Sequence, residues 1–197
     1  MCEIVEVKKI FCGLLIPLFL LNGMVLAEKR FSDLPVDQQI LLILTTLKYN
    51  KTFMNRLNDI DRIAIGYFHS ESPGSLAAKD QVLEVFEKHF KNKTFYSRGL
   101  IIDAISDISL ITAGKYNVLI VGPGTEPVIP EILAATRTNK IVSATGITDY
   151  MKSGISLVVG LKDNRKFLGI NLKNSRKENC RFSPTILQLA IILDKHE

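Results

Sequence analysis

Apolar residues recur at helical spacing between residues 35 and 57, which predicts an amphipathic first helix. The apolar stripe of this helix consists of Val36, Ile40, Ile43, Leu44 and Leu47. Pro35 suits the first helical turn, because its missing N–H would have no partner there in any case. The polar stretch 48–51 indicates that the helix breaks or bends.

Short apolar runs then alternate with helical patterns through the middle of the chain. The expected strands are 63–68, 95–101, 117–121 and 141–145, and the expected helices are 76–90 and 131–138. Strands that are apolar throughout are typical of a parallel sheet covered by helices on both faces. The sequence therefore predicts an α/β fold, a single Rossmann-like three-layer domain with a mainly parallel sheet.

The pattern changes in the last third of the chain. Two strand-like runs, 155–161 and 167–172, flank a polar turn at 162–165, which predicts a C-terminal antiparallel β-hairpin. A final helix is expected from Pro184, with Ser183 as its N-cap. The apolar residues of this helix are Ile186, Leu187, Leu189, Ala190, Ile192 and Leu193. Because they lie on more than one side, we expect a deeply packed C-terminal helix.

The N-terminal segment differs from the rest of the chain. Lys8 and Lys9 precede a run without charge, 10–27, which ends in the small residues that signal peptidases recognise. This order is that of a secretory signal peptide. We therefore predict a cleaved signal peptide, residues 1–27, followed by one α/β domain, residues 28–197.

Cleavage would also determine which cysteines the exported protein retains. Cys2 and Cys12 would leave with the signal peptide, so Cys180 would remain alone and no internal disulfide could form. Whether Cys180 is buried or pairs between chains stays open. The alternative to cleavage is a retained membrane anchor, which Pro17 and Asn22 disfavour in a run of about minimal spanning length.

The charge balance disfavours nucleic acid as a partner. The chain carries 25 basic and 20 acidic residues, a formal net charge of +5. Small basic groups are formed by Lys88, Lys91 and Lys93 and by Lys173, Arg176 and Lys177. A nucleic-acid-binding protein usually has a denser basic face with interleaved aromatic residues. We therefore expect no nucleic-acid partner.

Small polar residues gather where three of the predicted parallel strands end. Such turns lie at the carboxyl edge of a parallel sheet, where ligands of α/β folds bind. The candidate ligand-binding residues are Ser70, Ser72, Gly74, Ser75, Gly122, Gly124, Thr125, Ser143 and Thr145. Helix capping explains the first turn equally well, because its spacing matches neither a P-loop nor a Gly-x-Gly-x-x-Gly motif. The sequence leaves both interpretations open.

No pattern in the sequence predicts catalysis. His69, His89 and His196 have no metal-ligand spacing, and there is no Gly-x-Ser-x-Gly nucleophile elbow. Asp103 and Asp107 are expected to be solvated capping carboxylates rather than an acid–base pair. We therefore expect a non-enzymatic protein with no catalytic residues, no metal site and no cofactor.

Two tripeptides match the acceptor motif for N-glycosylation. Asn50 and Asn92 each begin an Asn-Lys-Thr sequence. The motif matters only where the host glycosylates exported chains.

Several motifs, taken in order, resemble those of the YfiR-like family of periplasmic regulatory proteins. They are LTTLKYNKTF, IAIGYF, SLAAKDQVLEVF, YNVLIVGPG and KDNRKFLGINLKNS, with a Phe-Ser before a leucine-rich helix. The resemblance covers almost all of the chain after the signal peptide. It implies an exported, non-enzymatic homodimer that binds a membrane signalling protein, a diguanylate cyclase or a sensor kinase. Such a regulator would restrain cyclic-di-GMP signalling and biofilm formation.

The chain departs from this family in its cysteines. The best-known member carries paired cysteines that form internal disulfides, whereas here the matching region offers only Cys180. Redox control through an internal bridge is therefore not expected.

A second function stays open beside regulation. The three turns at the carboxyl edge suit a periplasmic solute-binding protein with a small-molecule ligand. Ligand binding of this kind could also serve as an input to the regulator.

Overall fold

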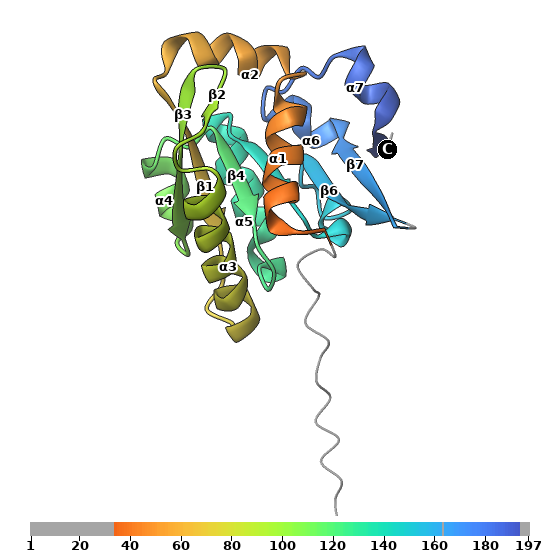
Figure 1. Ribbon diagram of the computed structural model, residues 1–197. Coiled ribbons are helices and arrows are strands. Elements are labelled where there is room, and N and C mark those ends of the chain that lie inside the picture. Colours follow the sequence, from red (N-terminus) through yellow and green to blue (C-terminus); the bar gives the residue numbers. More distant parts are fainter. Residues whose placement is uncertain (1–33, 163, 194–197) are drawn as a thin grey trace, which may run out of the picture.

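The apolar runs of the sequence become the strands of one eight-stranded sheet (Figure 1). The structure, a computed structural model, describes residues 34–162 and 164–193. The predicted signal peptide, residues 1–27, lies outside the described residues, as does the start of the predicted domain. Among the helices that are described, none has both the length and the apolar character to cross a bilayer.

The sheet has the strand order β2-β3-β1-β4-β5-β6-β7-β8. The strands are β1 (Arg62–Phe68), β2 (Thr94–Phe95), β3 (Arg98–Ile105), β4 (Val118–Val121), β5 (Val142–Thr145), β6 (Leu157–Lys162), β7 (Arg165–Asn171) and β8 (Ile191–Leu193). The central strands β3, β1, β4, β5 and β6 are parallel. β6 and β7 form the predicted antiparallel hairpin. The prediction of a mainly parallel sheet is therefore confirmed.

Helices connect most of these strands. They are α1 (Val36–Leu47), α2 (Lys51–Arg56), α3 (Pro73–His89), α4 (Ile108–Ala113), α5 (Ile129–Asn139), α6 (Leu172–Lys177) and α7 (Pro184–Leu189), with short 3₁₀ turns η1 (Leu57–Asp59), η2 (Glu126–Val128) and η3 (Thr148–Met151). The predicted first helix does break at its polar stretch. Asn50 has an extended backbone, and its side chain accepts the Phe53 N–H to cap α2.

Helices cover both faces of the sheet, which confirms the three-layer arrangement (Figure 1). Ile63 and Ile65 of β1 point to one face, where they belong to a buried cluster with residues of α1 and α3. Phe68 points to the other face, in a cluster with Ile111 of α4 and Ile132 of α5. Each large apolar side chain that is fully buried contributes about 1.5–3 kcal/mol, so these two clusters supply the main stabilisation of the fold.

The winding of the chain reverses between β1 and β4. From β1 the chain crosses through α3 to β3 on one side, and from β3 it returns through α4 to β4 on the other side. In open α/β sheets, ligands bind outside the carboxyl ends of the strands at such a reversal. The turns after β1 and β4, which contain most of the candidate residues, therefore lie at the point where a ligand site is expected.

The end of the chain differs from the prediction. The final helix begins at Pro184 as expected, but it ends at Leu189, and Ile191–Leu193 form strand β8 beside β7. The β-branched pair of isoleucines favours the extended conformation, and the outer edge of β7 offers it backbone partners. The expected deep packing is correct for Ile186, which is 7% exposed, but wrong for Leu189, which is 74% exposed.

A smaller difference concerns the expected strand 95–101. The continuous strand β3 begins at Arg98 and runs further, to Ile105. Tyr96 and Ser97 have positive φ angles and form the turn between β2 and β3. A turn without glycine or proline gives little sequence signal, which explains the shift.

Candidate functional site

The turn after β1 is a closed network of serine side chains. Ser75 Oγ accepts the backbone N–H of Ser70 at 2.9 Å, and the Ser70 hydroxyl donates to Ser72 Oγ at 3.1 Å. Ser72 Oγ also accepts the N–H of Ser75 at 3.3 Å, which caps α3. Gly74 lies in the first turn of this helix. The serines that suggested a ligand loop therefore hold the start of α3 in place.

The turn after β4 rests directly on these serines. Gly124 has φ +71°, and a Cβ atom at this position would lie 2.8 Å from Ser72 Oγ and 2.9 Å from Ser70 Oγ. A side chain there would collide with the hydroxyls and would also strain the backbone. The structure thus brings two of the three predicted turns into contact, at Ser70, Ser72 and Gly124.

Thr125 and Thr145 are fully buried beneath this contact. Thr125 Oγ1 donates to the carbonyl oxygen of Gly122 at 2.8 Å, within the turn after β4. Thr145 Oγ1 donates to Val121 O at 2.8 Å and accepts the N–H of Ile147 at 3.1 Å. The Thr145 hydroxyl joins the ends of β4 and β5, and the Thr125 hydroxyl closes the turn after β4, so both are used within the fold. Ser143 lies further back along β5 and belongs to a different network.

A cavity of about 370 Å³ opens beside the serine turn, at the carboxyl ends of β1 and β3. It is lined by Phe68, His69, Ser70, Ser106, Asp107, Ile108 and Val128. Of the nine predicted residues, only Ser70 reaches it. Asp107 caps α4 by accepting the Ser109 N–H at 2.8 Å, and this hydrogen bond lowers the pKa of its carboxyl group. The cavity thus pairs an apolar wall with one carboxylate that is ionised at neutral pH.

Ser143 belongs to a second polar cluster, centred on the buried carboxylate of Glu178. Thr136 Oγ1 donates to Glu178 Oε1 at 2.7 Å, and Asn174 Nδ2 donates to the same oxygen at 2.9 Å. The other oxygen, Oε2, accepts the Ser143 N–H at 2.9 Å and the Ser156 hydroxyl at 2.6 Å. Glu178 is 0% exposed and all its acceptor positions face donors. This carboxylate joins α5, β5, α6 and the start of β6.

Burial raises the pKa of the Glu178 carboxyl group, and the hydrogen bonds from Ser156, Ser143 and Thr136 oppose the rise. A raised carboxyl pKa would suit a general acid or base, but this group is sealed from solvent and does not line the 370 Å³ cavity. The geometry therefore supports a structural role for Glu178.

Sequence analysis did not single out Glu178. One usable signal was its spacing from Asn174, because residues four apart share one face of a helix. Another was the presence of Ser143 and Ser156 within otherwise apolar runs. Neither signal identifies the groups that bind the carboxylate, because Ser143 lies 35 positions away in the sequence.

Comparison with known proteins identifies the family. The model of the YfiR/HmsC-like family matches residues 72–191, which is more than half of the chain. The chain belongs to this family. The match confirms the sequence-based resemblance, and no curated protein sequence matches this YfiR/HmsC-like chain.

Solved structures share the fold of this YfiR/HmsC-like protein at low sequence identity. A conserved domain protein from Vibrio cholerae has a TM-score of 0.54 at 13% identity, over 81% of this chain and 60% of its own. The ABC domain in complex with L-Trp from Streptococcus pneumonia has a TM-score of 0.52 at 13% identity, over 81% and 60%. An open, ligand-free substrate-binding protein from Clostridium difficile has a TM-score of 0.55 at 11% identity, over 83% and 61%. The likeness is one of fold, and the chain spans only about three fifths of these proteins.

Acid–base chemistry has little support in the described part of this YfiR/HmsC-like chain. Burial raises the pKa of Tyr150 to about 12, so its hydroxyl stays protonated where it accepts the Thr125 N–H at 3.4 Å. His69 is 8% exposed, and its Nδ1 lies 3.1 Å from the carbonyl oxygen of Ser70. Among the described residues, no group of three or more His, Cys, Asp or Glu side chains could hold a metal ion.

Cys180 of the YfiR/HmsC-like protein is a buried thiol, 4% exposed. Burial raises its pKa to about 12, and the negative charge of Glu178 adds to this effect. The thiolate is the reactive form of cysteine, so a thiol with this pKa is inert at neutral pH. The structure therefore disfavours pairing of Cys180 between chains.

We expect the native thiol to resist labelling. In a variant with Cys2 and Cys12 replaced by serine, a thiol reagent at pH 8 should modify Cys180 at least about 100-fold more slowly in buffer than in denaturant, because thiolate fraction and access are both reduced. Stopped-flow absorbance with an aromatic disulfide reagent measures both rates. Equal rates in buffer and denaturant would show that Cys180 is accessible.

Proposed function

We propose that this protein is an exported periplasmic regulator that binds the periplasmic part of a membrane signalling protein. The observation that carries the proposal is the YfiR/HmsC-like family match over residues 72–191, because membership in this family indicates a periplasmic regulator rather than an enzyme. The partner is a diguanylate cyclase or a sensor kinase. Cleavage of the signal peptide, residues 1–27, delivers the protein to the periplasm.

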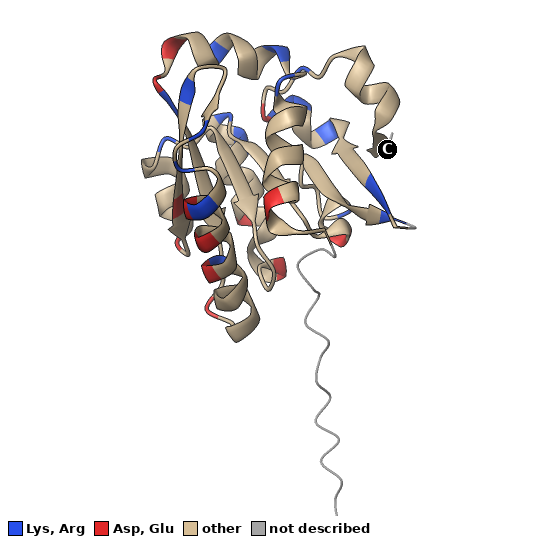
Figure 2. Cartoon of the chain, in the orientation of Figure 1, with Lys and Arg blue, Asp and Glu red and all other residues tan. Residues whose placement is uncertain are grey.

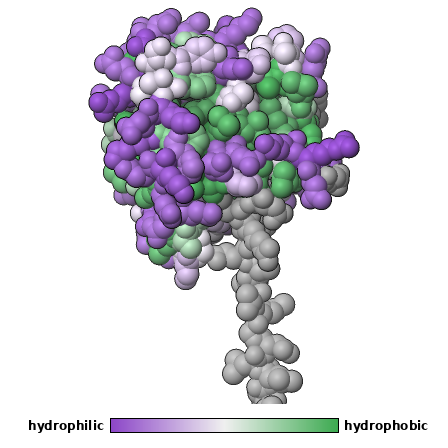
Figure 3. All heavy atoms as spheres, in the orientation of Figure 1, coloured by the Kyte–Doolittle hydropathy of each residue, from purple (hydrophilic) through white to green (hydrophobic). Residues whose placement is uncertain are grey.

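The surface proposed for the partner lies at the outer edge of the sheet. It consists of Leu189, Ile191 and Ile192, which are 74%, 45% and 37% exposed, and we call it the α7–β8 surface. Of the described strands, only β7 pairs with β8, so the other edge of β8 presents backbone donors and acceptors outward. Figure 3 shows apolar side chains gathered over α1 and α7. An exposed apolar edge strand of this kind is suited to adding a strand from a partner.

The homodimer that the family resemblance implies needs a second apolar contact. Leu41 of α1 is 58% exposed, whereas Ile40, Ile43 and Leu44 of the same helix are buried. We assign Leu41 to the contact between two copies and the α7–β8 surface to the membrane partner. Leu41 and the α7–β8 surface are then each assigned to one binding partner.

We expect charged substitutions on the α7–β8 surface to abolish regulation. The double substitution Leu189→Glu and Ile191→Glu should reduce the recovery of the membrane partner by about tenfold or more, because it places charges in an apolar contact. The measurement is co-purification with the membrane cyclase or sensor kinase, together with the cellular level of cyclic-di-GMP. Both substituted positions are exposed, so the fold should tolerate them.

Leu110→Glu is the matched control, because Leu110 is 44% exposed but lies on α4. It should leave partner recovery unchanged. The regulator proposal fails if deletion of the gene changes neither cyclic-di-GMP nor the output of the neighbouring sensor.

A second candidate function is binding of a small solute in the cavity lined by Phe68 and Ile108. The 370 Å³ volume, the apolar wall and the Asp107 carboxylate suit a small apolar molecule with an amino group. The fold shared with a substrate-binding protein supports this candidate. Ile108→Trp separates the two functions, because it fills the cavity and leaves the α7–β8 surface unchanged.

A further inference from the structure

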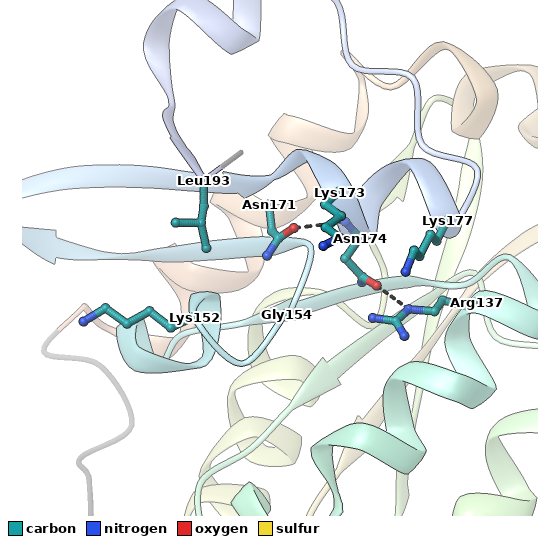
Figure 4. A pocket seen from close by; sticks show the side chains of 8 residues that line it. All are labelled: Arg137, Lys152, Gly154, Asn171, Lys173, Asn174, Lys177 and Leu193. Carbon is teal, nitrogen blue, oxygen red and sulfur yellow. Dashed lines mark hydrogen bonds between the residues drawn. The ribbon is translucent and has the colours of Figure 1, made fainter. Parts of the chain in front are cut away.

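A second cavity, of about 320 Å³, lies at the opposite edge of the sheet from the predicted turns (Figure 4). It is lined by Arg137, Lys152, Gly154, Asn171, Lys173, Asn174, Lys177 and Leu193. These residues come from the end of α5, the loop before β6, the ends of β7 and β8, and helix α6. β7 runs antiparallel to β6, so its carboxyl end meets the amino ends of β5 and β6 here.

The lining of this cavity is strongly basic. Arg137, Lys152, Lys173 and Lys177 contribute four positive charges, and no Asp or Glu from the part of the chain that the structure describes lines the cavity. Across residues 34–162 and 164–193, none of these four side chains forms an ion pair. Figure 2 shows basic residues on β7 and α6, whereas several acidic residues lie along α3. The Glu178 carboxylate is buried behind Asn174 and offsets only one of the four charges.

Arg137 is held in place from behind. Its Nε donates to Asn174 Oδ1 at 2.5 Å, while Asn174 Nδ2 is bound to Ser156 and to the Glu178 carboxylate. Asn174 is 2% exposed, so the guanidinium rests on a buried amide that is itself fixed. The remaining N–H groups of Arg137 are left for an acceptor in the cavity. In Figure 4, Lys177 lies close to Arg137, and Lys152 lies at the far end.

Gly154 keeps the space beside the guanidinium open. It has φ +110°, and a Cβ atom there would lie 2.8 Å from Leu133 Cδ1 and 4.0 Å from Arg137 Nη2. Any other residue would be strained at this φ and would narrow the cavity next to Arg137. Glycine is therefore required both for the backbone conformation and for the room beside Arg137.

We propose that this cavity binds a small oxyanion with more than one negative charge, a phosphoryl or polycarboxylate compound. Arg137 is the anchor, because guanidinium binds planar or tetrahedral oxyanions through paired hydrogen bonds. Lys173 and Lys177 neutralise the remaining charge, and Lys152 adds positive charge at the far end of the cavity. A volume near the lower end of the range for ligand pockets, about 300–1,000 Å³, limits the ligand to a small molecule. This inference goes beyond the proposed function, since it requires no partner protein.

Calorimetric titration of the purified protein with pyrophosphate and, separately, with citrate tests the proposal. The wild-type protein should bind at least one of them. The double substitution Lys173→Gln and Lys177→Gln should weaken that binding by about tenfold, because it removes two of the four charges. Both lysines are exposed, so the fold should persist, and thermal melting checks this.

The charge-matched control is Lys88→Gln with Lys93→Gln, two exposed lysines around the end of α3. It should bind as the wild type does. Absence of binding to both anions overturns the proposal, and so does an equal loss in the two double variants, which would show diffuse attraction to a basic protein. Pyrophosphate binding tighter than citrate binding would assign the site to phosphoryl compounds, and the reverse would assign it to polycarboxylates. Neither negative result affects the α7–β8 surface, so the regulator proposal is tested separately.

Discussion

Replacement of Glu178 by alanine is expected to lower the free energy of unfolding by about 3 kcal/mol. The carboxylate accepts hydrogen bonds from four groups, and its removal leaves the Ser143 N–H without an acceptor and Asn174 Nδ2 with only its bond to Ser156 Oγ. Each buried donor left without a partner costs about 1–3 kcal/mol. For a chain of this size, the loss corresponds to about 6–12 °C in melting temperature. Chemical denaturation and calorimetry measure both quantities.

Glu178→Gln gives a graded comparison. Its amide NH₂ must face either the Asn174 NH₂ or the Ser143 N–H, so one pair of donors is opposed whichever way the amide turns. We expect a smaller loss than for alanine, because three of the four donors keep an acceptor or rotate. Glu84→Gln on the exposed side of α3 is the matched control and should change stability by less than about 0.5 kcal/mol. A Glu178→Ala protein as stable as this control would contradict the structural role.

Replacement of Asn50 by alanine is expected to cost about 2–3 kcal/mol. Asn50 is 0% exposed, and its Oδ1 accepts the N–H of Phe53 at 3.3 Å and that of Arg181 at 3.0 Å. The first bond caps α2, which is worth about 1 kcal/mol. The second joins this cap to a segment 131 positions away, and its loss leaves a part-buried N–H without its partner.

Asn92 supplies a control with the same tripeptide. It also begins an Asn-Lys-Thr sequence, but its side chain is exposed. Asn92→Ala should therefore change the free energy of unfolding by less than about 0.5 kcal/mol in urea denaturation. Equal effects of the two substitutions would show that Asn50 is not a structural link. The burial of Asn50 also removes it as a glycosylation acceptor in the folded protein, whereas Asn92 stays accessible.

The sequence predicts the centre of this fold better than its ends. The runs that became β1, β4 and β5 are mostly apolar because helices cover both faces of the sheet, and that pattern is visible without a structure. The break after Leu47 was visible as well, since a polar stretch followed the apolar stripe. Residues 191–193 were predicted to continue the final helix, but they form a strand because they pair with the free edge of β7. No local sequence pattern reveals that edge.

Part of the candidate site was likewise predictable from the sequence, and part was not. Ser70, Ser72 and Gly124 were placed at one sheet edge by topology alone, and the structure brings them into contact. Ser143 was grouped with them because it is polar and near a strand end, but its N–H binds Glu178. The basic cavity gave only a faint signal, in Lys173 and Lys177, because Arg137 and Lys152 reach it from distant parts of the chain.

The short stretch from Glu178 to Arg181 has a consequence for how the domain opens. Within these four positions, the Glu178 carboxylate accepts hydrogen bonds from β5 and α5, and the Cys180 thiol packs in the apolar core. The Arg181 N–H donates to Asn50, the cap of α2. Helices α2 and α5 and strand β5, which are separated in the sequence, are thus tied to one short segment. The amide protons of α2, α5 and β5 should therefore exchange with solvent in one cooperative event, because opening any one of these elements breaks contacts with the same short segment.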